Sequence, residues 1–291
     1  SGWHGLADLP RARQEIGVAA LGGEIYIVGG FEGFSVVATV QAYNPCTDAW
    51  RDVAYLPRPL HHVSVAAHNG KLYALGGMIG LAFTPVPDVF AYDPGQNRWD
   101  PKTAMNVARG AGAVGVLGDK IYLAGGSVSA TVSVADASAY DTVNDRWETL
   151  PPLPAIADHL VGAGAGDRFF AIGGRAGGIT GVKNRVDAFD PAVGTWSTRT
   201  SLPTPRGGSS AAVVGGQIYV MGGEGNVDDP SGVFSQTEAY DPVADVWSTA
   251  APMRTPRHGT GAAAIAGVVF VPGGADVQSF GAVATHEAYV P

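Results

Sequence analysis

The sequence predicts an all-β protein in which six copies of one four-stranded unit close into a ring. An alternating apolar stretch that stops at two glycines recurs six times, with the second glycine at positions 30, 77, 126, 174, 223 and 274. An aromatic residue followed seven positions later by tryptophan recurs in five of these copies. The stretch before each double-glycine strand consists mostly of small residues. A period near fifty residues indicates a repeat architecture.

Each copy contains the signals of four strands, here called a to d, and the second copy illustrates them. Asn69-Gly70 lies between two apolar runs, which is typical of a two-residue hairpin because a type I′ turn needs positive φ at both central positions. The double glycine then ends strand b, and a longer loop precedes strand c. The predicted strands are 63–68, 71–77, 88–92 and 98–102, with the loop over 78–87.

The aromatic residue that ends strand c and the tryptophan that begins strand d are the largest side chains of the repeat. We expect them to pack between neighbouring sheets, because they supply most of the hydrophobic area available there. The pairs are Tyr43/Trp50, Tyr92/Trp99, Tyr140/Trp147, Phe189/Trp196 and Tyr240/Trp247.

Strand a differs from the other strands in the size of its side chains. Segments such as Gly112–Gly115 and Gly261–Ala264 contain only glycine, alanine and valine. Small side chains suit strands that converge on a common axis, and four-stranded sheets arranged radially around a channel require that taper. The sequence therefore predicts a six-bladed β-propeller rather than a linear solenoid.

The two ends of the chain predict how the ring closes. The last copy has strands a to c but stops before a fourth strand, and the first copy is preceded by an unmatched tryptophan, Trp3. We therefore expect residues 3–7 to form strand d of the last blade, which removes an exposed sheet edge. The chain is predicted to be a single propeller over 1–291, with blades over 9–54, 55–104, 105–152, 153–201, 202–251 and 252–291 plus 1–8.

Double glycine after an apolar strand, then tyrosine, then tryptophan, at this period, resembles the kelch repeat over essentially the whole chain. Two departures are Phe189 in place of tyrosine and Ala157 where other copies carry arginine. The resemblance implies a six-bladed kelch propeller with short turns on one face and the b–c and d–a loops on the other. Most kelch domains are protein-binding modules, and a minority are enzymes, so the resemblance implies no single activity.

Composition excludes several classes of function. A net charge of −8 argues against a nucleic-acid binder, which needs a basic face. No apolar run is long enough to span a bilayer, and no leader is visible. The single Cys46 is interpreted as a tolerated free thiol in a turn. The chain is expected to be a monomer, either trimmed or cut from a longer protein, and its compartment cannot be read from the sequence.

The segment before strand a should rim the channel, and counting back from the a–b turn aligns its residues. The tenth position back is arginine in four copies: Arg13, Arg109, Arg206 and Arg257. In a ring these side chains would converge at the channel mouth and could bind carboxylates in bidentate fashion. The alternative is that each arginine braces its own blade by pairing with the acid two positions before the strand-c aromatic, namely Asp187, Glu238 or Glu287.

The next two positions carry histidines and an acid that we predict to contact a ligand: His61, His62, Asp158, His159 and His258. They could gather a metal ion only if their rings converged. They come from blades on different sides of a channel expected to be wide, and no local metal-binding spacing is present. The sequence therefore predicts no metal and no cofactor. Asp158 and His159, being adjacent on a strand, should point to opposite faces and not form an acid–base pair.

The b–c loops are the second candidate ligand site. They are long and carry large apolar residues, which suits recognition by loops on a rigid scaffold. The alternative is that these residues fold down as lids over the blades. The residues are Phe31, Phe34, Met78, Phe83, Phe234 and Phe280.

These features favour a ligand-binding scaffold that uses the channel-mouth face to hold a protein, an acidic peptide or a glycan. The alternative is an enzyme on a small anionic sugar, of the sialic acid mutarotase type. There a rim arginine would clamp the carboxylate, and a rim histidine or Glu15 would move the proton. No residue is assigned a catalytic role from the sequence, and a strongly shifted pKa in a closed pocket would favour the enzyme.

Overall fold

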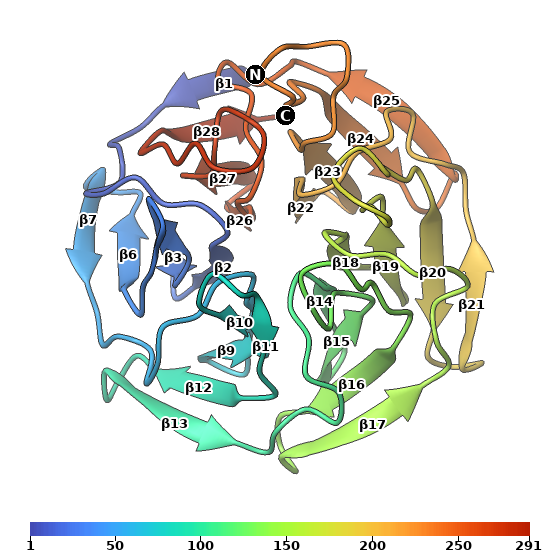
Figure 1. The fold of residues 1–291 in the computed structure, drawn as a ribbon, viewed down its shortest axis with the longest axis horizontal. Helices are drawn as coiled ribbons and strands as arrows, with labels where there is room; N and C mark the ends of the chain where they lie inside the picture. The colour runs from blue at the N-terminus through green and yellow to red at the C-terminus, as the bar shows by residue number, and fades with distance from the viewer.

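The computed structural model describes all of residues 1–291 as six four-stranded antiparallel sheets, the blades, arranged around a central channel (Figure 1). No helix in it could cross a bilayer. Each blade runs from an inner strand at the channel to an outer strand at the perimeter. Blade 1 contains β2 (Gly17–Leu21), β3 (Glu24–Val28), β6 (Val40–Asn44) and β7 (Ala49–Asp52); blade 2 contains β8 (Ser64–His68), β9 (Lys71–Leu75), β12 (Val89–Asp93) and β13 (Arg98–Lys102).

Blades 3 to 5 repeat this order. Their strands are β14 (Ala113–Leu117), β15 (Lys120–Ala124), β16 (Ala137–Asp141) and β17 (Arg146–Leu150); β18 (Val161–Ala165), β19 (Arg168–Ile172), β20 (Val186–Asp190) and β21 (Thr195–Thr198); β22 (Ser210–Val214), β23 (Gln217–Met221), β24 (Thr237–Asp241) and β25 (Val246–Ala250). Two b–c loops form small hairpins, β4 (Phe31–Glu32) with β5 (Ser35–Val36) and β10 (Met78–Ile79) with β11 (Thr84–Pro85).

Blade 6 joins the two ends of the chain, as the sequence predicts. Its strands are β26 (Ala263–Ile265), β27 (Val268–Pro272), β28 (His286–Val290) and β1 (Gly2–Gly5), and β1 pairs with β28 in the register Trp3 to Tyr289. The two termini lie close together in Figure 1. The Trp3 and Tyr289 rings lie 5.2 Å apart. The N-terminal segment therefore covers the edge that β28 would otherwise expose.

The hydrophobic core is divided into six clusters, each lying between two neighbouring blades. The repeat tryptophans also join blades through hydrogen bonds. Each indole N–H donates to a backbone carbonyl of the connection from the preceding blade, as Trp99 does to Ala54 O at 2.8 Å. The other five bonds run from Trp3, Trp50, Trp147, Trp196 and Trp247 to Ala251, Ala7, Thr103, Pro151 and Thr200.

The c–d turn adds a second contact to the same connection in four blades. The Tyr140 hydroxyl donates to Asp145 Oδ1 at 2.5 Å, and that oxygen also accepts from the backbone N–H of Thr103 at 2.8 Å. Blades 1, 2 and 5 repeat this arrangement with Asp48, Asn97 and Asp245. In blade 4 the connection residue is Pro151, which has no N–H to donate, so the acceptor and the hydroxyl have no role there. This explains why Phe189 and Gly194 replace tyrosine and the acid.

Six backbone hydrogen bonds form a closed circle around the channel axis. The residue eight positions before the end of each a–b turn has positive φ, between 51° and 64°, and donates its N–H to the same residue of a neighbouring blade. The distances are 2.5–3.1 Å. The bonds run from Glu15 to Gly259, His62 to Glu15, Ala111 to His62, His159 to Ala111, Gly208 to His159 and Gly259 to Gly208. This backbone circle brings six chain segments close to the axis on the side of the b–c loops.

Candidate functional site

The four repeat arginines do not face the channel mouth. Each is at most 3% exposed, and each guanidinium group is bound within its own blade. Arg206 pairs with Glu238 at 2.5 Å, and Arg257 pairs with Glu287 at 2.7 Å. This is the bracing arrangement that the sequence left open as the alternative to a basic rim.

Arg13 and Arg109 occupy the same place with neutral partners. Arg13 donates to Gln41 Oε1 at 2.7 Å, and Arg109 donates to the Ser138 hydroxyl at 3.0 Å. Both also bind backbone carbonyl oxygens of their own blade. Burial lowers the pKa of each arginine to about 10. The guanidinium groups are therefore occupied inside the sheets, and a ligand at the mouth has no direct access to them.

The channel mouth instead carries a polar cluster formed by Glu15, His61, His62, Asp158, His159, Arg175, Glu224 and His258. His62 Nε2 lies 3.0 Å from His159 Nε2 and 3.1 Å from Glu15 Oε2, although the three residues come from blades 2, 4 and 1. The expectation of a wide channel with separated histidines is wrong, because the backbone circle narrows the mouth and Ala111 between His62 and His159 leaves room for both rings.

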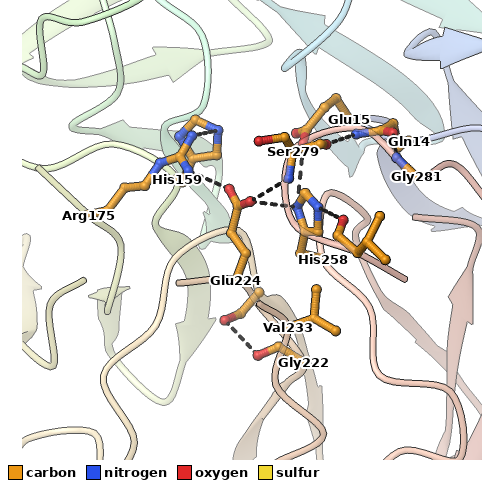
Figure 2. A network of polar contacts seen from close by, with 12 residues as sticks. Gln14, Glu15, His159, Arg175, Gly222, Glu224, Val233, His258, Ser279 and Gly281 are labelled. Carbon is orange, nitrogen blue, oxygen red and sulfur yellow. Dashed lines mark hydrogen bonds and ion pairs between the residues drawn. The ribbon is translucent and has the colours of Figure 1, made fainter. Parts of the chain in front are cut away.

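Arg175 and Glu224 connect the two sides of this cluster. Figure 2 shows the Glu224 carboxylate between Arg175 and His258. Arg175 Nη1 lies 2.5 Å from Glu224 Oε1, and its Nη2 donates to His159 Nε2 at 3.0 Å. His258 Nδ1 lies 3.5 Å from the other Glu224 oxygen. The backbone N–H of Ser279 in blade 6 donates to that oxygen at 3.2 Å, so the Glu224 side chain links blades 4, 5 and 6.

Arg175 and Glu224 were not predicted as site residues, although the sequence contains a signal for them. Each follows a double glycine directly, and its backbone forms a bridge with the residue nine positions before the end of the a–b turn, in these blades Asp158 and Gly207. The equivalent residues in the other blades are Phe31, Met78, Ser127 and Ala275, which are uncharged. Opposite charges on neighbouring blades at a position that is otherwise uncharged could have indicated a contact.

Asp158 and His159 do interact, contrary to the expectation from strand alternation. His159 Nδ1 lies 2.6 Å from Asp158 Oδ1, because His159 has a positive φ of 51° and is not in an extended strand. Asp158 also accepts from the Ser133 hydroxyl and from Arg175. Although burial opposes it, the hydrogen bond from His159 lowers the pKa of the Asp158 carboxyl.

Burial dominates the pKa shifts of three members of the cluster, Glu15, His61 and His62. Burial raises the pKa of the Glu15 carboxyl to about 7, with His258 opposing the rise and Glu224 adding to it. Burial lowers the pKa of His61 to about 4 and lowers that of His62 well below its ordinary value. The carboxylate of Glu15 fits because Gly259 has no side chain: a Cβ there would lie 2.5 Å from Glu15 Oε1.

Two adjoining pockets open above the cluster, of about 200 and 380 Å³. Both are lined by His62, Phe83, His159, Arg175 and Ile179. The smaller pocket also contacts Glu15, Glu224 and His258. The polar cluster thus forms the floor of a cup, and the b–c loops form its walls.

The large apolar residues of the b–c loops divide into two groups. Phe31, Met78 and Phe234 are buried as lids, at most 8% exposed, whereas Phe34 is 68% exposed and Phe280 is 36% exposed. Phe83 is half-buried in the wall of both pockets. The Phe34 and Phe280 rings lie 5.0 Å apart, although their loops belong to blades 1 and 6.

Comparison with known proteins gives consistent matches. The profile of the KLHDC2/KLHL20/DRC7 Kelch-repeats domain matches residues 106–274, and that of the Kelch motif matches residues 12–57 and 59–106. Kelch-like protein terF of Aspergillus terreus is 35% identical over 195 residues, which cover 63% of this chain and 42% of that protein. Kelch-like protein 34 of Homo sapiens is 31% identical over 191 residues, 64% of this chain and 29% of that protein.

The alignments therefore span less than half of the length of either curated relative. A solved structure described as "Structure of YjhT" superposes with a TM-score of 0.80 and 16% sequence identity, covering 98% of this chain and 95% of the other. At that identity the likeness shows the fold alone.

Proposed function

Because this chain belongs to the kelch-repeat β-propeller family, whose domains are generally protein-interaction scaffolds, we propose that it is a binding module whose partner lies on the channel-mouth face. The observation that carries this proposal is the exposed pair formed by Phe34 and Phe280. Exposed aromatic rings on rigid loops are suited to be the central contacts of a protein interface.

The aromatic pair is supported from below. The buried Phe31 ring lies 5.3 Å from Phe280 and 6.1 Å from Phe83, so three loops share one apolar layer. Leu81, which is 58% exposed, is a further exposed apolar residue in the b–c loop of blade 2. The preferred ligand is therefore a peptide or protein segment that presents an apolar or aromatic side chain to the wall of the cup.

The preference for acidic ligands receives little support from the arginines. The four repeat arginines are buried, and Arg175 at the mouth is already paired with Glu224 and Asp158. The shifted pKa values of Glu15 and His62 favour the alternative of an enzyme on a small anionic sugar, but that alternative also needs an arginine clamp for the carboxylate. It would require Arg175 to leave both carboxylates, so the apolar wall is the stronger basis for a proposal.

The test is selection from a displayed library of random peptides on the purified domain. We expect enriched peptides to contain aromatic or large aliphatic residues and to bind the Phe34→Ser/Phe280→Ser variant at least tenfold more weakly, since a central aromatic contact is worth about 2 kcal/mol or more.

A matched control is Val243→Ser, which removes an exposed apolar residue, 93% exposed, from a c–d turn on the opposite face. Peptide binding should be unchanged in this variant. Peptides that bind the wild type and the Phe34→Ser/Phe280→Ser variant equally would contradict the proposed face.

A further inference from the structure

Three atoms that can ligate a metal meet in the floor of the cup. They are a carboxylate oxygen of Glu15, Nε2 of His62 and Nε2 of His159, and all lie within 4.8 Å of one another. The sequence predicted no metal because these residues were expected to lie apart. Because the three residues do converge, the reason for predicting no metal no longer holds.

Hydrogen bonds fix the proton positions on His61 and His62. His61 Nε2 lies 3.0 Å from the carbonyl oxygen of Gly80, which can only accept, so the proton of a neutral His61 is on Nε2. Its Nδ1 is then an acceptor, and His62 Nδ1, 2.6 Å away, must donate to it. A neutral His62 therefore has its lone pair on Nε2, the atom that faces Glu15 and His159.

The same reasoning applies to His159. Its Nδ1 donates to Asp158 at 2.6 Å, which leaves the lone pair of a neutral ring on Nε2. Two imidazole lone pairs therefore face each other at 3.0 Å, with the Glu15 carboxylate 3.1 Å from one of them. Acceptors at this distance repel unless a proton or a cation lies between them, and of the two imidazole acceptors only His159 Nε2 also accepts from Arg175 Nη2, at 3.0 Å.

We propose that Glu15, His62 and His159 form a binding site for a divalent transition-metal ion such as zinc. Two imidazoles and a carboxylate are a donor set that suits this class of ion. Separations of 3.0 and 3.1 Å approach the edge of a tetrahedron, about 3.3 Å, for bonds of about 2.0 Å. The Nδ1–H groups of both histidines are held by Asp158 and His61, as in metal sites where an outer partner orients the ring.

A second observation points to the same place. His258 is fully buried, its Nε2 donates to the carbonyl of Val277, and its Nδ1 has no hydrogen-bond partner. That Nδ1 faces the carboxylates of Glu15 and Glu224 at 3.7 and 3.5 Å. Arg175 is the only permanent cation beside the carboxylates of Glu15 and Glu224, and a metal ion on Glu15 would add positive charge there.

Arg175 competes with a metal ion for this site. Its Nη2 donates to the same His159 lone pair that the metal would use. Glu224 and Asp158 hold Arg175 independently of His159, so the guanidinium can yield that single hydrogen bond. The pocket of about 200 Å³ above Glu15, His62 and His159 gives access from the loop face and leaves a coordination position for water or a ligand.

The test is titration of the full chain, freed of metal by a chelator, with cobalt(II) followed by visible absorption, and then displacement by zinc. We expect one strongly bound ion per chain and a spectrum of low coordination number. His62→Gln and Glu15→Gln should each weaken binding more than tenfold, and Arg175→Gln should strengthen it. His68→Gln, which removes a histidine bound to Thr142 outside the cluster, should leave binding unchanged.

Absence of stoichiometric cobalt binding to the wild type would overturn the proposal, since that measurement needs no variant. Equal loss in His62→Gln and His68→Gln would do the same. Circular dichroism of each variant checks that it folds. The site does not depend on the proposed partner surface: Phe34→Ser/Phe280→Ser should bind metal normally, so failure of one proposal is distinguishable from failure of the other.

Discussion

Two positions of the segment before strand a, two residues apart, direct their side chains to different parts of the molecule. The arginines at the tenth position back point into the blades, where Glu238, Glu287 and neutral groups bind them. Two residues later, Glu15, His62 and His159 point to the axis and contact one another across blades. The arginine occurs in four of the six copies, whereas the axial position carries glutamate once, histidine twice, alanine once and glycine twice. In this molecule the polar residue that recurs most often stabilises the scaffold, and the candidate site forms at a position whose residue type varies between copies.

The largest expected effect that tests this distinction comes from the buried ion pairs. Arg257→Met leaves Glu287 buried without its cation and should lower the free energy of unfolding by about 3–5 kcal/mol. Arg13→Met leaves the neutral Gln41 and should cost about 1–3 kcal/mol. Urea denaturation measures both. Arg257→Met/Glu287→Met should recover much of the loss, whereas equal losses in the two single variants would show that the partner charge is unimportant.

The next test concerns a histidine that is buried between two blades rather than at the channel mouth. His286 is 1% exposed and packs between blades 6 and 1 against Tyr43 and Trp50. Burial lowers its pKa to about 4, with the Ala7 carbonyl and Asp48 opposing this and Arg257 reinforcing it.

The unfolded chain therefore binds a proton at this residue between pH 6.5 and 4, and the folded chain does not. Stability should fall as the pH drops through this window, by at most about 3 kcal/mol from His286. In urea denaturation at pH 7 and 4.5, His286→Phe should lose less stability on acidification than the wild type. The difference between the free energies of unfolding of the two proteins should become constant above pH 7. Equal losses of stability on acidification would contradict the lowered pKa of His286.

The smallest expected effect concerns the c–d turns. Asp145→Ala removes the acceptor for the Thr103 N–H and the Tyr140 hydroxyl, and should cost about 1–2 kcal/mol, measured as a lowered melting temperature. Gly194→Asp restores the acid in blade 4 but should bring no gain, because Pro151 has no N–H. A clear stabilisation by Gly194→Asp would show that the proline is not the reason for the departure.

Much of the fold could be predicted from the sequence because it depends on local, periodic features. The double glycines, the aromatic pairs and the orphan Trp3 identify the blades and the closure of the ring, and the structure confirms these elements. The alignment by counting back from the a–b turns brought His62, Asp158 and His159 to the mouth, whereas Arg13 in the same alignment lies inside its blade.

The direction of each side chain could not be predicted. It depends on positive φ at six positions, several of them occupied by residues such as Glu15 and His159 that rarely adopt it. The width of the mouth depends on backbone bonds between blades, which residue identity does not encode. Two of the six loop residues predicted to contact ligand, Phe34 and Phe280, are clearly exposed, because the hairpin geometry decides which side chains fold down.

Because of the circle of backbone hydrogen bonds, the distances within the candidate site depend on the number of blades. This circle surrounds the axis at the level between the cup and the channel cavity. Its circumference is set by one link per blade. A seventh copy inserted by gene duplication would enlarge that circumference and draw Glu15, His62 and His159 apart, even if every blade kept its sequence.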